Sequence, residues 1–359
     1  MKKIISIPVY ILVTVLCSMF VVSCSEDSPV TPIAEGPYQF DSARYDWSFD
    51  SIPGEFITFN AFDTSNIFLL GVQSLVQYNG ESFIYHYYVD NSFYPLSMGS
   101  YDKNNIFIGG HDFSIANFGI PKLKKWNGVG FDDIPIPDSS NNFNSISSIF
   151  AIKNDEIWMG SAKGDLIHYN QGKFEFLRLD STFYFTMFGK DEFGNYYSVA
   201  VKTVFDSLTI NYLNIYKKVK DQWQWSLVFS EKYFGYDINE IQPALINNYI
   251  SGFQNNNIVS FTGNIFQSIF QIKPFNAYPV SRLSDTSINF FLMPGLIENG
   301  RIELFHWNGN KWSKEVDLSK AGIFPEGFIT IENVDGKYFG LCVDRSFGFS
   351  FFGKGEKRK

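Results

Sequence analysis

The chain has few of the residues by which catalytic, metal-binding and nucleic-acid-binding proteins are recognised from sequence. It contains only three cysteines and four histidines in 359 residues, with neither an HExxH motif nor a paired-cysteine spacing, so no metal site and no cofactor is predicted. Its 29 lysines and arginines are outnumbered by 37 aspartates and glutamates, and a net charge of −8 argues against nucleic acid as a partner. With 45% hydrophobic residues, the chain is nevertheless too apolar to be disordered.

The first 24 residues have the order of features found in a lipoprotein export signal. Two lysines precede the apolar run 4–22, and Val21-Val22-Ser23-Cys24 resembles the lipobox of bacterial lipoproteins. The resemblance implies that signal peptide 1–23 is removed and that acyl chains such as palmitate attach to Cys24. The lipid would hold the protein at the outer membrane of the cell envelope, on its periplasmic face or at the cell surface. An uncleaved membrane anchor is the alternative, because 19 apolar residues are about enough to span a bilayer.

Cleavage would leave a mature chain with two predicted parts. Residues 24–36, rich in serine, proline and acids, are expected to form a tether, and residues 37–359 the folded domain. The net charge would become −10, since both leader lysines are lost, and Cys342 would be the single free thiol. Without an internal disulfide, an exported domain must derive its stability from its core.

Aromatic residues make up 18% of the chain, and they recur in a repeated strand. Aromatic and β-branched residues favour pleated sheet over helix, so an all-β fold is predicted. One apolar strand, preceded by a polar turn, occurs seven times at intervals of 39 to 53 residues. The seven copies of this strand are residues 67–71, 106–110, 157–161, 196–199, 249–252, 288–291 and 338–341.

A repeat of this length is typical of a β-propeller blade, in which four strands form one small twisted sheet. The last copy supplies only three strands, and the strand at 45–49 has no partners before it. We therefore expect residues 45–49 to complete the last blade and close a seven-bladed ring. Residues 154–170 resemble the repeat of two-component-regulator-type propellers in bacterial sensor proteins. That resemblance implies the sensing or binding half of such a protein, without its transmitter.

Three of the seven units carry extra residues between their second and third strands. We expect these loops, at 111–121, 202–211 and 294–300, to crown one face of the ring, whose mouth is a natural concave binding site. Ancestral duplication of a two-blade unit would explain the alternation equally well. The candidate ligand-binding residues in or beside these loops are His111, Asp112, Phe113, Phe118, Lys202, Asp206, Glu298, Asn299 and Arg301.

Motifs that imitate catalytic or ligand-binding signatures do not fit on closer reading. Residues 348–354 imitate a P-loop, but Gly355 stands where a serine or threonine must reach magnesium. His168 and His306 occupy a repeat position that holds Gln77 in another copy, so a polar residue of any kind suits that position. No catalytic residue is predicted.

The sequence therefore favours a non-catalytic binding module at the envelope, with a glycan or an envelope protein as its ligand. One alternative is a propeller-type polysaccharide lyase or glycoside hydrolase, because catalytic pairs drawn from separate blades cannot be recognised in sequence. Two facing carboxylates at the mouth would favour that enzyme, whereas a lining of Phe, Asn and Ser would favour binding. A scaffold subunit of an envelope complex is the other alternative.

Overall fold

Strands make up almost all of the described structure, as the aromatic composition predicts. The computed structural model describes residues 41–359 except 89, 113–119, 138–144, 162, 180–182, 191–194, 205–209, 220–223, 235–241, 247–248, 255–256, 262–265, 272–276, 280–288, 295–302, 309–310, 322–326 and 345–347. The chain divides into two compact units, 1–38 and 39–359, and every described residue belongs to the second. Cys24 and the predicted tether therefore lie outside the described residues. In the part of the chain that is described, no helix has the length and hydropathy needed to cross a membrane.

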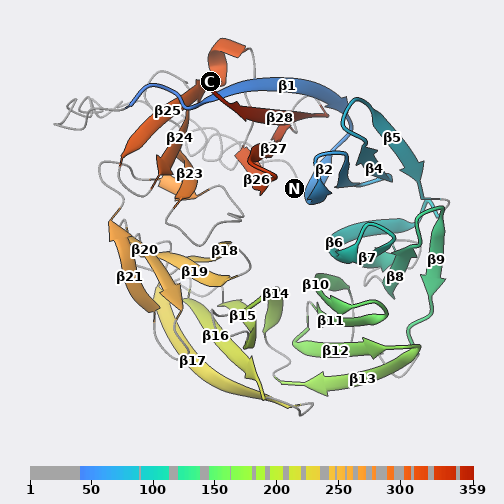
Figure 1. Ribbon diagram of the computed structural model, residues 1–359. Coiled ribbons are helices and arrows are strands. Elements are labelled where there is room, and N and C mark those ends of the chain that lie inside the picture. Colours follow the sequence, from blue (N-terminus) through green and yellow to red (C-terminus); the bar gives the residue numbers. More distant parts are fainter. Residues whose placement is uncertain are drawn as a thin grey trace, which may run out of the picture. The chain divides into compact units, whose positions relative to one another are not determined.

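Three antiparallel four-stranded sheets follow one another along the first half of the domain (Figure 1), and in each sheet every strand hydrogen-bonds to the next strand in the chain. The first sheet contains β2 (Phe56–Asp63), β3 (Asn66–Gly71), β4 (Ser74–Tyr78) and β5 (Phe83–Tyr87). The second contains β6 (Phe93–Asp102), β7 (Asn105–Asp112), β8 (Ile120–Trp126) and β9 (Phe131–Ile134). The third contains β10 (Ile146–Lys153), β11 (Glu156–Ser161), β12 (Asp165–Asn170) and β13 (Lys173–Arg178).

The next eight strands belong to one sheet that consists of two antiparallel groups. One group is β14 (Tyr184–Lys190), β15 (Tyr196–Val204), β16 (Ile210–Lys218) and β17 (Trp225–Phe234). The other is β18 (Gln242–Ile246), β19 (Tyr249–Gln254), β20 (Asn257–Phe261) and β21 (Phe266–Gln271). The two groups are joined where β14 pairs with β19, through the parallel partners Lys190 and Tyr249.

Two further four-stranded sheets complete the described chain. One contains β22 (Ala277–Pro279), β23 (Asn289–Pro294), β24 (Glu303–Asn308) and β25 (Trp312–Asp317), followed by a one-turn 3-10 helix, Ser319–Ala321. The other contains β26 (Gly327–Val334), β27 (Lys337–Asp344) and β28 (Phe349–Lys357), and its fourth strand is the N-terminal β1 (Tyr45–Pro53). β1 pairs with β28 along its whole length, from Tyr45 opposite Lys357 to Pro53 opposite Phe349.

Short polar turns join the first two strands of a sheet because an aspartate side chain replaces missing backbone partners. Asp63 Oδ1 accepts hydrogen bonds from the backbone N–H of Ser65 at 2.8 Å and from Asn66 Nδ2 at 2.9 Å. Asp102 does the same for Asn104 and Asn105 in the second sheet. Aspartate and asparagine favour turns for this reason, and the repeated turn fixes the register of each hairpin.

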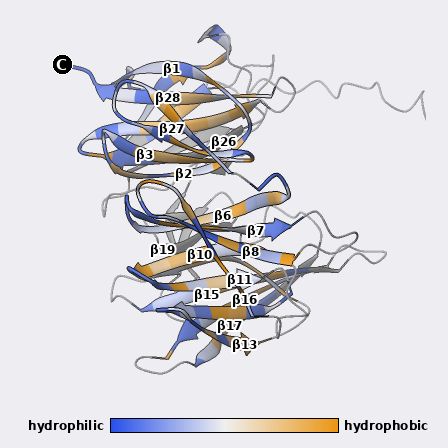
Figure 2. Ribbon diagram, turned by 90° about the vertical axis from the view of Figure 1, so that its right-hand side faces the viewer, coloured by the Kyte–Doolittle hydropathy of each residue, from blue (hydrophilic) through white to orange (hydrophobic). Residues whose placement is uncertain are grey.

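Aromatic and aliphatic side chains fill the spaces between consecutive sheets. The first strands of neighbouring sheets touch, with β2 against β6 and β26, and β10 against β6 and β14. Phe352 of the last sheet packs against Phe59, Tyr78 and Phe83 of the first. Figure 2 shows hydrophobic stretches along the strands and hydrophilic residues at many of the turns. The described aromatic rings thus serve mainly to pack one sheet onto the next.

Glycine at the end of a second strand lets the next sheet approach closely. A Cβ atom on Gly109 of β7 would lie 2.4 Å from Cγ2 of Ile146, and one on Gly160 of β11 would lie 2.4 Å from Cβ of Phe185. Both distances are shorter than packed carbon atoms allow, so the absence of a side chain is a packing requirement here. This explains why glycine recurs at this point of the repeat.

Candidate functional site

Three of the nine predicted ligand-binding residues lie in the described structure, and all three lie on strands. The spacing predicts loops from 111 and 202, but cross-strand pairing continues beyond both positions, and this corrects the prediction. His111 pairs with Pro121 and Asp112 with Ile120, while Lys202 pairs with Tyr212. The other six predicted residues are outside the described residues: Phe113, Phe118, Asp206, Glu298, Asn299 and Arg301.

The three described residues take part in two separate sets of contacts. Asp112 forms an ion pair with Lys122 at 2.7 Å, and the ring of His111 packs against that of Tyr94 at 5.5 Å. Burial lowers the pKa of His111. Lys202 belongs to another sheet, where it places its ammonium over the ring of Tyr212 on the neighbouring strand, 5.6 Å from the centroid. The structure therefore brings His111 and Asp112 together and assigns Lys202 to a different place.

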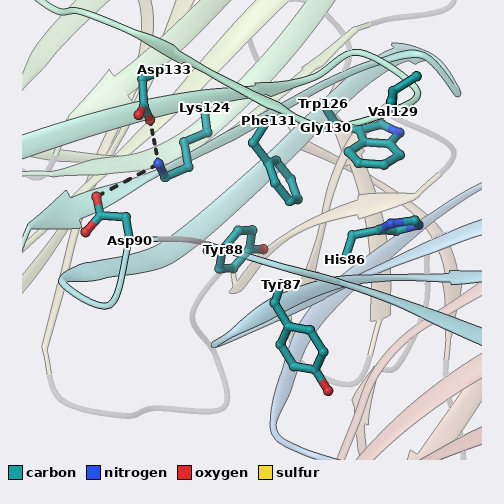
Figure 3. A pocket seen from close by; sticks show the side chains of 10 residues that line it. All are labelled: His86, Tyr87, Tyr88, Asp90, Lys124, Trp126, Val129, Gly130, Phe131 and Asp133. Carbon is teal, nitrogen blue, oxygen red and sulfur yellow. Dashed lines mark hydrogen bonds and ion pairs between the residues drawn. The ribbon is translucent and has the colours of Figure 1, made fainter.

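A groove lies between the first and second sheets. It has a volume of about 480 Å³, within the ~300–1,000 Å³ typical of ligand sites. One wall is the outer strand β5 and the segment after it, and the other is formed by β8, β9 and the turn between them (Figure 3). The lining residues are His86, Tyr87, Tyr88, Asp90, Lys124, Trp126, Val129, Gly130, Phe131 and Asp133.

One end of the groove is charged. Lys124, whose side chain is only 5% exposed, forms an ion pair with Asp133 and lies 3.9 Å from the carboxylate of Asp90. Asp90 also pairs with Lys122, which in turn binds Asp112. Lys122 thus connects the sequence-predicted residue Asp112 to the groove. The hydrogen bond from Lys122 lowers the pKa of Asp90 to about 2, so this carboxylate stays ionised at neutral pH.

The other end of the groove is aromatic. The rings of His86 and Trp126 lie with their centroids 4.3 Å apart, and Phe131 packs against Trp126 at 5.3 Å and against Tyr88 at 5.1 Å. Burial lowers the pKa of His86, which keeps the imidazole neutral at pH 7. Trp126 is only 3% exposed. Neither Trp126 Nε1 nor His86 Nε2 has a hydrogen-bond partner in the described structure.

The charged groups of the groove can be compared with those that acid–base and metal chemistry require. A glycosidase needs one carboxylic acid with a raised pKa as proton donor, whereas the pKa of Asp90 is lowered. Among the described residues, no group of three or more histidine, cysteine, aspartate or glutamate side chains could hold a metal ion. Aromatic rings, two ring nitrogens without a partner in the described structure and fixed charges line the groove, and such groups can recognise a ligand by contact and hydrogen bonding.

Two histidines that lie away from the groove occupy structural positions. His168 of β12 is buried, stacks on Trp158 at 4.7 Å and hydrogen-bonds Glu156 at 3.1 Å. The equivalent Gln77 of β4 donates to Asn66 at 3.3 Å. His306 of β24 is also buried, and burial lowers its pKa to about 3. Both imidazoles are neutral packing groups at physiological pH.

Sequence reasoning missed His86 and Trp126, although the repeat contains a signal for His86. His86 of β5 pairs with Leu75, the second residue of β4. In the third sheet, Leu177 of β13 pairs in the same way with Leu166, the second residue of β12. Leu177 packs into an apolar cluster. Since the equivalent residue packs in an apolar cluster in the third sheet, a histidine at this position indicates that His86 has a role other than packing.

Comparison of the sequence with protein-family models and with curated proteins finds no match. A solved structure described as "YCF48 bound to D1 peptide" is similar to this chain, with a TM-score of 0.59 and 14% identity, covering 88% of this chain and 99% of that one. The WD40 β-propeller domain of Doa1 gives a TM-score of 0.45 and 10% identity over 86% and 96% of the two chains. That second score is too low to indicate a shared fold by itself. The first similarity and the four-stranded sheets together identify the chain as a β-propeller, as the repeat predicts.

Proposed function

We propose that this chain is a seven-bladed β-propeller, anchored by lipid in a bacterial envelope, that binds a segment of a partner protein without catalysis. The blade number follows if the eight-stranded sheet is divided where β14 meets β19, since it then contributes two blades of four strands. β1 then supplies the fourth strand of the last blade and closes the ring through its pairing with β28. Closure suits a propeller, because an open stack would expose an apolar face at each end.

The groove between β5 and β8–β9 is the observation that carries the binding role. It combines buried rings with unpaired ring nitrogens and ionised side chains, and its volume suits a short stretch of an extended chain. YCF48, a structure similar in fold, is described as bound to a peptide, which supports a peptide over a glycan as the ligand. The lowered pKa of Asp90 supports binding over hydrolysis.

Anchoring at the envelope rests on the export signal and on Cys24. We expect a Cys24→Ala variant to lose radiolabelled palmitate and to leave the membrane fraction. A variant that stays in the membrane with an uncleaved leader would support the membrane-anchor alternative and refute lipidation.

Selection from a random nine-residue peptide library displayed on phage tests the binding role. The full-length protein is immobilised, and enrichment is compared with that on an unrelated control protein. We expect enriched peptides that, once synthesised, bind with dissociation constants in the micromolar range, equivalent to about 8 kcal/mol. A selection with no enrichment over the control would refute the protein-binding role, and binding on a glycan array would then favour a glycan.

A further inference from the structure

Two buried polar atoms in the groove lack the partners that buried polar atoms normally have. Trp126 Nε1 and His86 Nε2 are both without a hydrogen bond in the described structure, and their rings lie 4.3 Å apart in the groove lining. The large majority of buried side-chain polar atoms are hydrogen-bonded, and each exception requires an explanation. An indole N–H can only donate, whereas a neutral imidazole nitrogen can accept. A peptide group supplies one carbonyl oxygen and one N–H, the complement of this pair.

The repeat shows that His86 is not needed for packing. The third sheet has Leu177 at the same register, and there the space is filled by an apolar cluster that includes Trp158 and Trp225. Trp225 Nε1 also lacks a partner in the described structure, but its ring is packed within that cluster. In the groove between the first and second sheets, the indole without a partner lies beside His86 in the lining of a cavity.

The charges at the other end of the groove leave an excess of negative charge. Among the described residues there, three carboxylates, from Asp90, Asp112 and Asp133, surround the two ammonium groups of Lys122 and Lys124. Lys124 is buried, whereas the side chain of Asp133 is 76% exposed and can accept further hydrogen bonds. A ligand that brings a positive charge would balance the cluster, and the acidic chain would attract it.

The rim of the groove also offers exposed apolar surface. Tyr87 on β5 is 65% exposed, and Val129 in the turn between β8 and β9 is 91% exposed. An aromatic ring near a carboxylate suits the ammonium or guanidinium of a long side chain, because the aliphatic stem packs on the ring while the charge meets the acid.

We infer that this groove binds an extended basic peptide: the rings of His86 and Trp126, whose Nε2 and Nε1 atoms are closed to solvent in the described structure, shift to hydrogen-bond one peptide group, and a lysine or arginine side chain of the peptide pairs with the exposed Asp133. The inference rests on the proposed protein-binding function and names the partner's chemistry. The partner is a protein with an exposed, flexible segment in which a basic residue lies within a few residues of the bound peptide group.

The peptides enriched from the nine-residue phage library provide the test. We expect lysine or arginine to be over-represented in them, and the synthesised peptides to bind more weakly as salt rises. Val129→Lys and Val129→Glu place opposite charges on a highly exposed rim position, where neither should affect folding. The first should weaken binding about threefold and the second should strengthen it about threefold, as one exposed charge pair does.

A second pair of variants tests the unpaired nitrogens. Trp126→Phe keeps an aromatic ring but removes Nε1, and His86→Leu restores the residue type of the third sheet. Each should weaken peptide binding about three- to tenfold, the effect of one hydrogen bond. Trp126→Phe also removes buried ring atoms and should lower the unfolding midpoint in urea, as the same change at the buried Trp225 does. Trp225→Phe is the matched control and should bind the peptide like the wild type.

The outcomes separate the inference from the proposed function. If enriched peptides are acidic or uncharged, or bind all groove variants as tightly as the wild type, the groove assignment is wrong although the protein still binds peptides. If no peptide is enriched over the control protein, the proposed function itself is refuted. Basic peptides that lose affinity in Trp126→Phe and respond oppositely to the two Val129 variants support the inference.

Discussion

Glu315 of β25 ties the start of β1 to the neighbouring sheet, so its removal should loosen the proposed ring closure. Its Oε2 accepts hydrogen bonds from the backbone N–H groups of Arg44 and Tyr45, both at 3.0 Å, and its Oε1 accepts from the hydroxyl of Ser313. A hydrogen bond to a charged group contributes about 1.5–3 kcal/mol. Since the two backbone groups are only partly buried, we expect Glu315→Ala to lower the free energy of unfolding by about 3 kcal/mol.

Glutamine at this position should cost less, because its amide oxygen still accepts from the two N–H groups, while its NH2 group replaces the acceptor of the Ser313 hydroxyl and can instead donate to that oxygen. We expect about 1 kcal/mol for Glu315→Gln. Asp46→Asn, which removes an exposed ion pair between β1 and Arg358 just after β28, should change stability by less than about 0.5 kcal/mol.

Urea unfolding followed by tryptophan fluorescence measures all three variants, and hydrogen exchange of the β1 amides shows whether the loss is local. We expect Glu315→Ala to speed exchange in β1 more than in β11. A cost below about 0.5 kcal/mol for Glu315→Ala, or unchanged exchange in β1, would show that Glu315 does not hold the start of β1.

Three further predictions concern the core and the charged cluster. Because the pKa of Asp90 is lowered from its usual value near 4, the ionised carboxylate stabilises the fold above that pH, and Asp90→Asn should cost about 1 kcal/mol at pH 6. This difference from the wild type should vanish as the pH falls toward 2. A difference in urea midpoints that does not change with pH would contradict this. Burial raises the pKa of the Cys342 thiol, so Ellman's reagent should react with it only after unfolding. Rapid reaction of this thiol in the native protein would show that the last blade opens. A Cβ on Gly110 would lie 2.0 Å from the carbonyl oxygen of Tyr94, so Gly110→Ala should destabilise the protein by about 3 kcal/mol. Gly130→Ala should not, because the space around Gly130 is open. Equal thermal unfolding midpoints for the two variants would contradict this packing.

The strand repeat could be predicted because its signal is local. The second strand of each unit is an apolar run after a polar turn, and the predicted segments 67–71, 106–110 and 157–161 fall within β3, β7 and β11. The pairing of residues 45–49 with the last sheet also follows from sequence, since three strands at one end and one at the other leave a single completing arrangement. Local periodicity and counting were sufficient for these features.

The ends of strands and the groove required the structure. β7 and β15 extend through His111 and Lys202 because their partners continue the hydrogen-bond ladder, which residue spacing alone does not reveal. His86 and Trp126 come from different sheets, 40 positions apart, and meet only because β5 of one sheet faces β8 of the next. Contacts between blades depend on how neighbouring sheets pack, and no pattern within one repeat encodes that geometry.

Hydrogen–deuterium exchange of the full-length protein, with and without a peptide enriched from the phage library, tests the central claim most directly. The account predicts that peptide binding slows exchange in β5, in the segment around Asp90 and in β8–β9, and leaves β16 and β20 unchanged. Protection confined to other sheets, with the groove segments unaffected, would contradict the claim that this groove is the binding site.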